Sequence, residues 1–281
     1  MLILYQPPAY VQQEKADKKP DIQQKSSGDN SPNVITGNNS TVNINTAPTP
    51  QFLKSISEVG AKAAMVVRSG KVNDDPLVVL KAPQFTGFWV DAGGYAATCV
   101  SASEPPPVEY PHIVATVVMP PLPGDRMEWA GGEFNVPAKV AARSHDVAIL
   151  YAPGINEERV SFLASDSKTG KSHETDEYAV AELSPLLPHV GDQVFLVGAE
   201  PGLDPRLSTF DGSIVSVGPG MQGGIRIFAK LPFKPSYCGA PIFNSKKQII
   251  GLLEQPSENS GEIVAIPAIY IIRSLRELLD Q

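Results

Sequence analysis

One stretch of the sequence carries more structural information than any other: Pro235-Ser236-Tyr237-Cys238-Gly239-Ala240-Pro241-Ile242-Phe243-Asn244. After Ser245 it continues through the polar residues 246–248 into Ile249-Ile250-Gly251-Leu252. A Cys-Gly turn is therefore followed by a short apolar run, a polar turn and a second apolar run. This pattern is typical of two consecutive β-strands joined by a turn.

The composition limits the classes of protein to which the chain can belong. With 281 residues, of which 42% are hydrophobic and 19% charged, it is long enough for one or two domains with a real core. Two cysteines exclude a disulfide-rich scaffold and a multi-cysteine zinc module. The 23 Lys and Arg against 30 Asp and Glu give a net charge of −7, which argues against nucleic acid or anionic lipid as a partner.

Residues 1–50 are predicted to form a flexible polar tail, because they lack apolar periodicity. Within the tail, residues 31–44 carry a hairpin signal, in which Val34-Ile35 and Val42-Asn43-Ile44 flank a Gly-Asn-Asn-Ser turn. A lone hairpin is marginal in water, so it is a candidate for self-association, whereas a polar linker is the simpler interpretation. No membrane anchor is visible, and an envelope-associated and a cytoplasmic location fit equally well.

From about residue 51 the sequence consists of short β-prone runs bounded by Gly, Pro or Asp. Only two segments have helical spacing, residues 52–64 and residues 268–279. Many short strands with one amphipathic C-terminal helix predict a β-barrel or sandwich protein. The predicted strands are 64–67, 85–90, 113–119, 147–151, 194–198, 225–228, 249–253 and 262–266.

The stretch around Cys238 resembles the nucleophile loop of chymotrypsin/trypsin-like proteases, G-x-S-G-G-P, with Cys238 in the serine position. Other segments resemble the same family in the family's chain order, as in its bacterial trypsin-like peptidase domains. They are Thr86-Gly87-Phe88-Trp89-Val90, Gly94 to Ser101, Ser144-His145-Asp146-Val147-Ala148-Ile149-Leu150, Gly191 to Gly198, Thr209 to Ser216, and Gly261-Glu262-Ile263-Val264-Ala265-Ile266-Pro267.

The resemblance implies an all-β fold of two six-stranded Greek-key β-barrels, the chymotrypsin-like double barrel, with a C-terminal helix and a disordered N-terminal tail. The trypsin-like domain is expected to span residues 51–281. Its first barrel is expected at 51–180, its second at 181–267 and its helix at 268–281.

In the family's register the three triad positions read Ser101, Asp146 and Cys238. Asp146 is in the triad aspartate position and Cys238 in the nucleophile position, but Ser101 replaces the histidine. A hydroxyl does not bind a proton near pH 7, so Ser101 cannot serve as general base and then general acid. The other histidines, His112, His145, His173 and His189, are interpreted as surface or loop residues.

The oxyanion hole of the family corresponds to the backbone N–H groups of Ser236 and Cys238. Ser236 replaces a glycine, and Pro235 stiffens the chain just before it. The loop is therefore expected either to take an inactive conformation or to hold the oxyanion hole with strain, and these departures, with the missing histidine, favour lost function. No Cys/His pair has zinc-ligand spacing, and we expect neither a metal nor a cofactor.

Cys99 lies two residues before the histidine position, so it approaches the same cleft as Cys238 from the other barrel. A disulfide or shared thiol chemistry is one interpretation. The favoured one makes Cys99 a small buried hydrophobe in the core of the first barrel.

The family resemblance also implies that Leu252, Leu253 and Glu254 offer a strand edge to an extended peptide by β-augmentation. Our first hypothesis is therefore an inactive peptidase homologue (a pseudoprotease) that binds or senses peptides or proteins. The alternative is an active endopeptidase that uses Cys238 with a non-standard or partner-supplied base. A third hypothesis is a structural role in which residues 31–44 drive assembly.

Overall fold

The computed structural model describes residues 24–25, 34–35, 48–72, 77–79, 84–104, 108–118, 133–154, 180–201, 206–220, 223–258 and 261–280. It divides into two units, residues 1–47 and residues 48–281. In the first unit β1 (Gln24–Lys25) pairs antiparallel with β2 (Val34–Ile35). The predicted hairpin partner of β2, residues 42–44, lies outside the described residues, as does most of the predicted tail. The described partner of Val34-Ile35 is thus Gln24-Lys25, which sequence patterning did not single out.

The second unit opens with helix α1 (Pro50–Ala63), which confirms the first predicted helix. The hydroxyl Oγ1 of Thr49 accepts a hydrogen bond from the N–H of Phe52 at 3.3 Å, and Pro50 occupies the first helical turn, where its missing N–H costs nothing. Gly60 brings the helix close to the second barrel, because a Cβ at that position would lie 2.4 Å from Cγ2 of Val197.

The first barrel follows in the order β4-β3-β5-β6-β9-β8-β7, and β3 also pairs with β7. Six strands therefore close on themselves, while β4 adds to the edge of β3. The elements are β3 (Ala64–Val72), β4 (Leu77–Val79), β5 (Phe85–Trp89), β6 (Tyr95–Cys99), the 3-10 turn η1 (Val100–Ser103), β7 (His112–Val118), β8 (Glu133–Ser144) and β9 (Val147–Tyr151).

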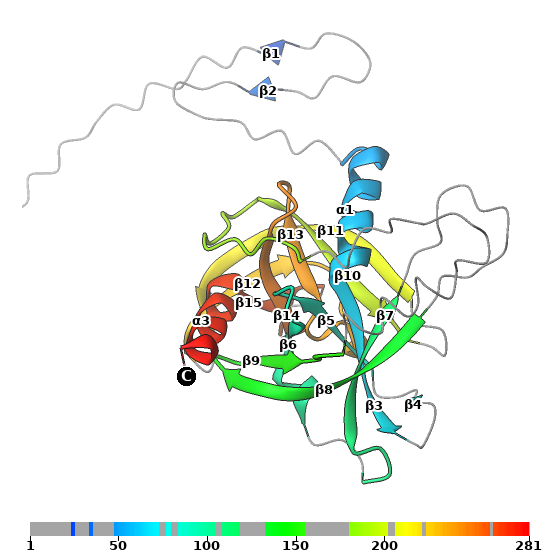
Figure 1. Ribbon diagram of the computed structural model, residues 1–281. Helices are drawn as coiled ribbons and strands as arrows, with labels where there is room; N and C mark the ends of the chain where they lie inside the picture. The colour runs from blue at the N-terminus through cyan, green and yellow to red at the C-terminus, as the bar shows by residue number, and fades with distance from the viewer. Residues whose placement is uncertain are drawn as a thin grey trace, which may run out of the picture. The chain divides into compact units, whose positions relative to one another are not determined.

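The second barrel is closed in the order β10-β11-β12-β15-β14-β13. The predicted fold, two six-stranded antiparallel barrels with a C-terminal helix, is confirmed (Figure 1). The elements are β10 (Gln193–Glu200), β11 (Arg206–Pro219), β12 (Ile225–Lys230), the 3-10 turn η3 (Pro235–Tyr237), β13 (Pro241–Asn244), β14 (Ile249–Pro256) and β15 (Ile263–Pro267).

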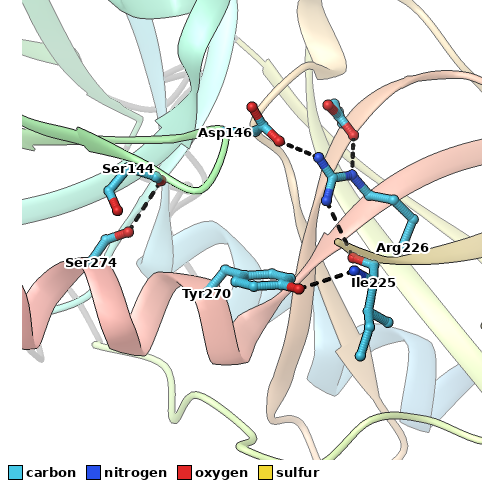
Figure 2. Close-up of polar contacts among 7 residues, drawn as sticks. Ser144, Asp146, Ile225, Arg226, Tyr270 and Ser274 are labelled. Atoms are coloured by element: carbon cyan, nitrogen blue, oxygen red, sulfur yellow. Dashed lines mark hydrogen bonds and ion pairs between the residues drawn. The ribbon is translucent and has the colours of Figure 1, made fainter. Parts of the chain in front are cut away.

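Helix α3 (Ala268–Leu279) binds to both barrels, and its bounds agree with the predicted helix. It contacts β8 and β9 of the first barrel and β14 and β15 of the second (Figure 1). The hydroxyl of Ser274 donates to the carbonyl oxygen of Ser144 at 3.2 Å, and the hydroxyl of Tyr270 accepts from the N–H of Ile225 at 3.0 Å (Figure 2). The helix therefore fixes one barrel against the other.

The barrels also share an apolar core. One cluster of buried side chains includes Phe88 and Ile149 of the first barrel together with Phe195, Leu252 and Ile266 of the second. Burial of apolar surface across the interface makes independent motion of the barrels unfavourable. Among the described residues, no helix combines the length and apolar character needed to cross a membrane.

The packing between β11 and β12 generates a stability prediction. A Cβ at Gly212 in β11 would lie 1.9 Å from the carbonyl oxygen of Lys230, whereas a Cβ at Gly218 in the same strand meets nothing within 4 Å. We expect Gly212→Ala to lower the free energy of unfolding by about 1–3 kcal/mol because it separates two paired strands. Gly218→Ala, the matched control, should stay within roughly 0.5 kcal/mol of wild type. Urea unfolding measures both, and equal effects would contradict the packing described for this strand pair.

Candidate active site

The loop that contains Cys238 is held by backbone hydrogen bonds from both barrels. From the first barrel, the N–H of Thr86 donates to the carbonyl of Cys238 at 3.0 Å, and its hydroxyl donates to the carbonyl of Ser236 at 2.7 Å. From the second barrel, the N–H of Gly239 donates to the carbonyl of Leu253 at 2.7 Å. These contacts fix the loop at the junction of the barrels.

Gly239 makes this junction sterically feasible. Its φ of +86° lies in the left-handed region that favours glycine. A Cβ on Gly239 would lie 2.1 Å from the carbonyl oxygen of Thr86 and 2.9 Å from the backbone nitrogen of Cys99. No side chain fits there, so the sequence Cys-Gly brings Cys238 directly against the end of β6.

Cys99, at the end of β6, forms a disulfide with Cys238. Their Cα atoms lie 5.7 Å apart, in the middle of the range that disulfides require. Cys99 is buried, as expected, but the favoured interpretation of it as an unbonded core residue is wrong. In this form the sulfur in the nucleophile position carries no proton to lose, so it cannot become a thiolate.

Ser101, in the position of the family's histidine, lies in η1 immediately after β6, and its side chain is exposed. The buried neighbour Ser103 accepts a hydrogen bond from Nε of Arg143 at 2.8 Å, which ties this turn to β8. Chain connectivity therefore places Ser101 two residues from the disulfide. It supplies a hydroxyl there in place of an imidazole.

Asp146 lies in the turn between β8 and β9, where His145 and Asp146 adopt φ values of 55° and 65°. Its carboxylate forms an ion pair with the guanidinium of Arg226, which comes from β12 of the second barrel (Figure 2). Nε of the same guanidinium lies 2.7 Å from Oε2 of Glu254 in β14. One arginine thus joins Asp146 of the first barrel to Glu254 of the second.

The Arg226 side chain is only 5% exposed, while those of Asp146 and Glu254 are 43% and 19% exposed. Burial lowers the pKa of Arg226, but the hydrogen bonds and charges of Glu254 and Asp146 outweigh it and raise that pKa. The guanidinium therefore stays charged and satisfies both carboxylates. An Asp146 carboxylate held in this way is directed to Arg226 rather than to a catalytic base.

The predicted oxyanion hole has one donor already in use. The N–H of Cys238 donates to the carbonyl of Pro235 at 3.3 Å, which closes the 3-10 turn η3. Ser236 is buried, and its hydroxyl makes no hydrogen bond within the part of the chain that the structure describes. An N–H committed to its own turn is not positioned to stabilise an oxyanion.

The strand edge predicted for peptide binding is altered by a β-bulge. Leu253 pairs with Ala265 and Gln255 with Val264, so Glu254 is the extra residue between them. Leu253 is committed to the loop, because its N–H donates to the carbonyl of Ala240 and its carbonyl accepts from Gly239. Leu252 pairs with Pro241 of β13.

Three residues were predicted to bind substrate, and one of them, Glu254, has its carbonyl next to the sulfur of Cys238. Its carbonyl oxygen lies 3.2 Å from Sγ of Cys238. A disulfide sulfur carries no hydrogen, so this is a contact and the carbonyl is not accepting a hydrogen bond from Cys238. Beyond it, Gln255 and Pro256 are exposed.

Of the described histidines, His145 contacts helix α3 and the other two are exposed. His145 stacks on Tyr270 of α3 with ring centroids 5.4 Å apart, and its Nδ1 lies 2.5 Å from Oγ of Ser144. His112 and His189 are exposed, and His173 lies outside the described residues. In the described part of the chain no cluster of three or more His, Cys, Asp or Glu could hold a metal ion.

Thr86 and Arg226 were missed as site residues by the sequence analysis. Both are buried polar residues in short apolar strands, which is the signal that could have found them, because buried polar groups need partners. Their partners lie 150 and 80 residues away in the chain, respectively, and no local pattern identifies these partners.

Tyr237, next to Cys238, anchors the loop in the second barrel. Its fully buried ring packs against Gly198, and its hydroxyl donates to Glu200 at 2.6 Å. Burial, followed by the hydrogen bond to Glu200, raises the pKa of Tyr237 to about 12. Burial raises the pKa of Glu200, but hydrogen bonds from Lys234 and Tyr237 outweigh it and lower that pKa overall.

The raised pKa of Tyr237 predicts a loss of stability at alkaline pH. Its contribution is fully present below the unfolded pKa of about 10 and is lost as the pH rises towards 12. Tyr237→Phe should cost roughly 1 kcal/mol at pH 7, because Glu200 loses a donor. The variant should then lose less stability than wild type between pH 9 and pH 11, measured by urea unfolding. Parallel pH profiles would contradict the role given to the hydroxyl.

Comparisons with known proteins agree with this architecture. The chain is 14% identical to Rv3671c from M. tuberculosis H37Rv, solved as an inactive serine-to-alanine mutant, with a TM-score of 0.54 over 84% of this chain and 96% of that one. It is 15% identical to a serine endoprotease from Yersinia pestis, with a TM-score of 0.56 over 84% and 69% of the two chains. No curated protein sequence matches significantly. The sequence model of one protein family, the trypsin-like peptidase domain, matches residues 85–252, more than half of the chain. The chain therefore belongs to the trypsin-like peptidase domain family.

Proposed function

We propose that this protein is a proteolytically inactive member of its family that binds an extended peptide or protein segment. The observation that carries the proposal is the Cys99–Cys238 disulfide, which occupies the sulfur in the nucleophile position. Acyl transfer needs a thiolate or an activated hydroxyl at that position, and a disulfide supplies neither.

Two further features support the inactive half of the proposal. Ser101 cannot accept and return a proton near pH 7, so the freed thiol of Cys238 would still lack a base. Arg226 binds the carboxylate of Asp146, so the group that orients the base in this family has another partner. Restoring one part alone would leave the others missing.

The binding half of the proposal rests on the cleft end of β14. On one side, β14 pairs with β13 only as far as Leu252, which lies opposite Pro241. Beyond that pair, from Glu254 to Pro256, the only strand that pairs with β14 in the described chain is β15 on its other side. At the bulge of β14 the carbonyl oxygen of Glu254 lies beside Sγ of Cys238. An extended segment could add its backbone to such an edge without any catalytic group.

The inactive half is tested with a library of random cysteine-free peptides and mass spectrometry of the products. The full chain, with and without dithiothreitol, should give no more cleavage than Cys238→Ala. Cys99→Ser, which leaves the Cys238 thiol free, should also be inactive because Ser101 provides no base. Cleavage by wild type or by Cys99→Ser that disappears in Cys238→Ala would overturn the proposal.

The binding half predicts that peptides are recognised through their backbone at the end of β14. With a photocrosslinking benzoylphenylalanine in place of Gln255, the protein should capture peptides from the same library. The same residue in place of Lys246, exposed at the far turn of β13 and β14, is the matched control and should capture none. N-methylation of the captured peptides should weaken binding by roughly tenfold or more, since it removes backbone donors. Equal capture at both positions, or no effect of N-methylation, would argue against β-augmentation.

A further inference from the structure

We propose that the Cys99–Cys238 disulfide is a reversible redox site that regulates the peptide cleft. The regulation rests on the proposed peptide binding, whereas the redox chemistry can be tested without it. The disulfide joins the two barrels beside the bulge of β14. Cys99 and Cys238 are the two cysteines of the sequence. Reduction of the disulfide would place a free thiol of Cys238 beside the carbonyl of Glu254.

The surrounding structure holds both cysteines in place without the covalent bond. The carbonyl of Cys238 accepts from Thr86, the N–H of Gly239 donates to Leu253, and Cys99 pairs with Val147 in the ladder between β6 and β9. Helix α3 and the shared apolar core also join the barrels. After reduction the two thiols therefore remain close enough to form the disulfide again.

The exposure of the two sulfur-bearing residues indicates where a reductant attacks. Cys238 is 8% exposed and Cys99 2%. A thiolate of an external dithiol attacks Sγ of Cys238, the bond to Cys99 breaks, and Cys99 leaves with the electron pair and takes up a proton. The second thiol of the dithiol then attacks the mixed disulfide and releases Cys238. Two electrons and two protons pass to the protein, and the dithiol is oxidised to a disulfide.

Reduction adds a hydrogen-bond donor at the cleft edge. In the disulfide form, Sγ of Cys238 lies 3.2 Å from the carbonyl oxygen of Glu254 and carries no hydrogen, so the carbonyl can accept from a peptide N–H. In the reduced form, the S–H of Cys238 donates to the same oxygen and competes with the peptide. A thiol is a weak donor, so we expect the reduced form to bind peptides about threefold to fivefold more weakly.

The experiment compares the full chain before and after treatment with dithiothreitol, a dithiol. We expect native circular dichroism in both forms and faster iodoacetamide labelling of Cys238 than of Cys99 after reduction. The disulfide mass should return when dithiothreitol is replaced by oxidised glutathione, a small-molecule disulfide that takes up the two electrons and two protons. Affinity for the peptides captured through Gln255 should fall on reduction. Cys99→Ser, which keeps the Cys238 thiol, should reproduce the reduced affinity, whereas Cys238→Ala, which has neither disulfide nor donor, should stay near the oxidised value.

The outcomes separate this inference from the proposed function. A disulfide that resists native-state reduction, or whose reduction unfolds the domain, overturns the redox site. Equal peptide affinity in the oxidised and reduced forms overturns the regulation and leaves peptide binding intact. If no peptide binds either form, the proposed function and its regulation both fail, and site-specific labelling and re-oxidation still decide whether the redox site exists.

Discussion

The close approach of the two barrels at Gly239 is the constraint on which the rest of the site depends. The backbone of the second barrel meets the carbonyl of Thr86 and the nitrogen of Cys99 where any Cβ would collide. Because Gly239 passes between these two backbone atoms, the preceding residue, Cys238, lies against the end of β6. The disulfide, the contact of Cys238 with Glu254 and the closed η3 turn all follow from that position.

A cluster of three charged side chains, centred on Arg226, also joins the two barrels. Arg226 lies between Asp146 and Glu254, and the two carboxylates share its single positive charge. Removing one partner of a buried ion pair leaves the other charge uncompensated, which costs more than the pair itself contributes. Arg226 thus binds the carboxylate of the residue predicted for the triad aspartate position, and Cys99 is bonded to the residue predicted for the nucleophile position.

The barrels could be predicted well from the sequence because each strand and helix has a recognisable local pattern of residues. Short apolar runs between turn residues located most strands, and the spacing of Ile271 and Leu275 located α3. Strand β8 was missed, since Pro137 interrupts it and most of its side chains are only partly buried, so it lacks clear alternation. The pairing of β2 with β1 was not predicted, because pairing in a short polar segment is weakly specified by sequence.

The site was harder to predict because its interactions join distant parts of the chain. The prediction that Ser101, Asp146 and Cys238 lie around one cleft rested on the family register alone. The bond between Cys99 and Cys238 spans 139 residues, and a buried cysteine has the same sequence pattern whether or not it is bonded. Arg226 had the pattern of an ordinary polar residue in a strand, since burial and partners are properties of the folded barrels.

The central claim is that the sulfur in the nucleophile position is bonded to Cys99. Proteolytic mapping of the purified full chain by mass spectrometry, after iodoacetamide treatment without reductant, tests it directly. The account predicts one cross-linked pair of peptides that contains Cys99 and Cys238, with no alkylated cysteine. Alkylation of both cysteines in the folded protein that has not been reduced would contradict it.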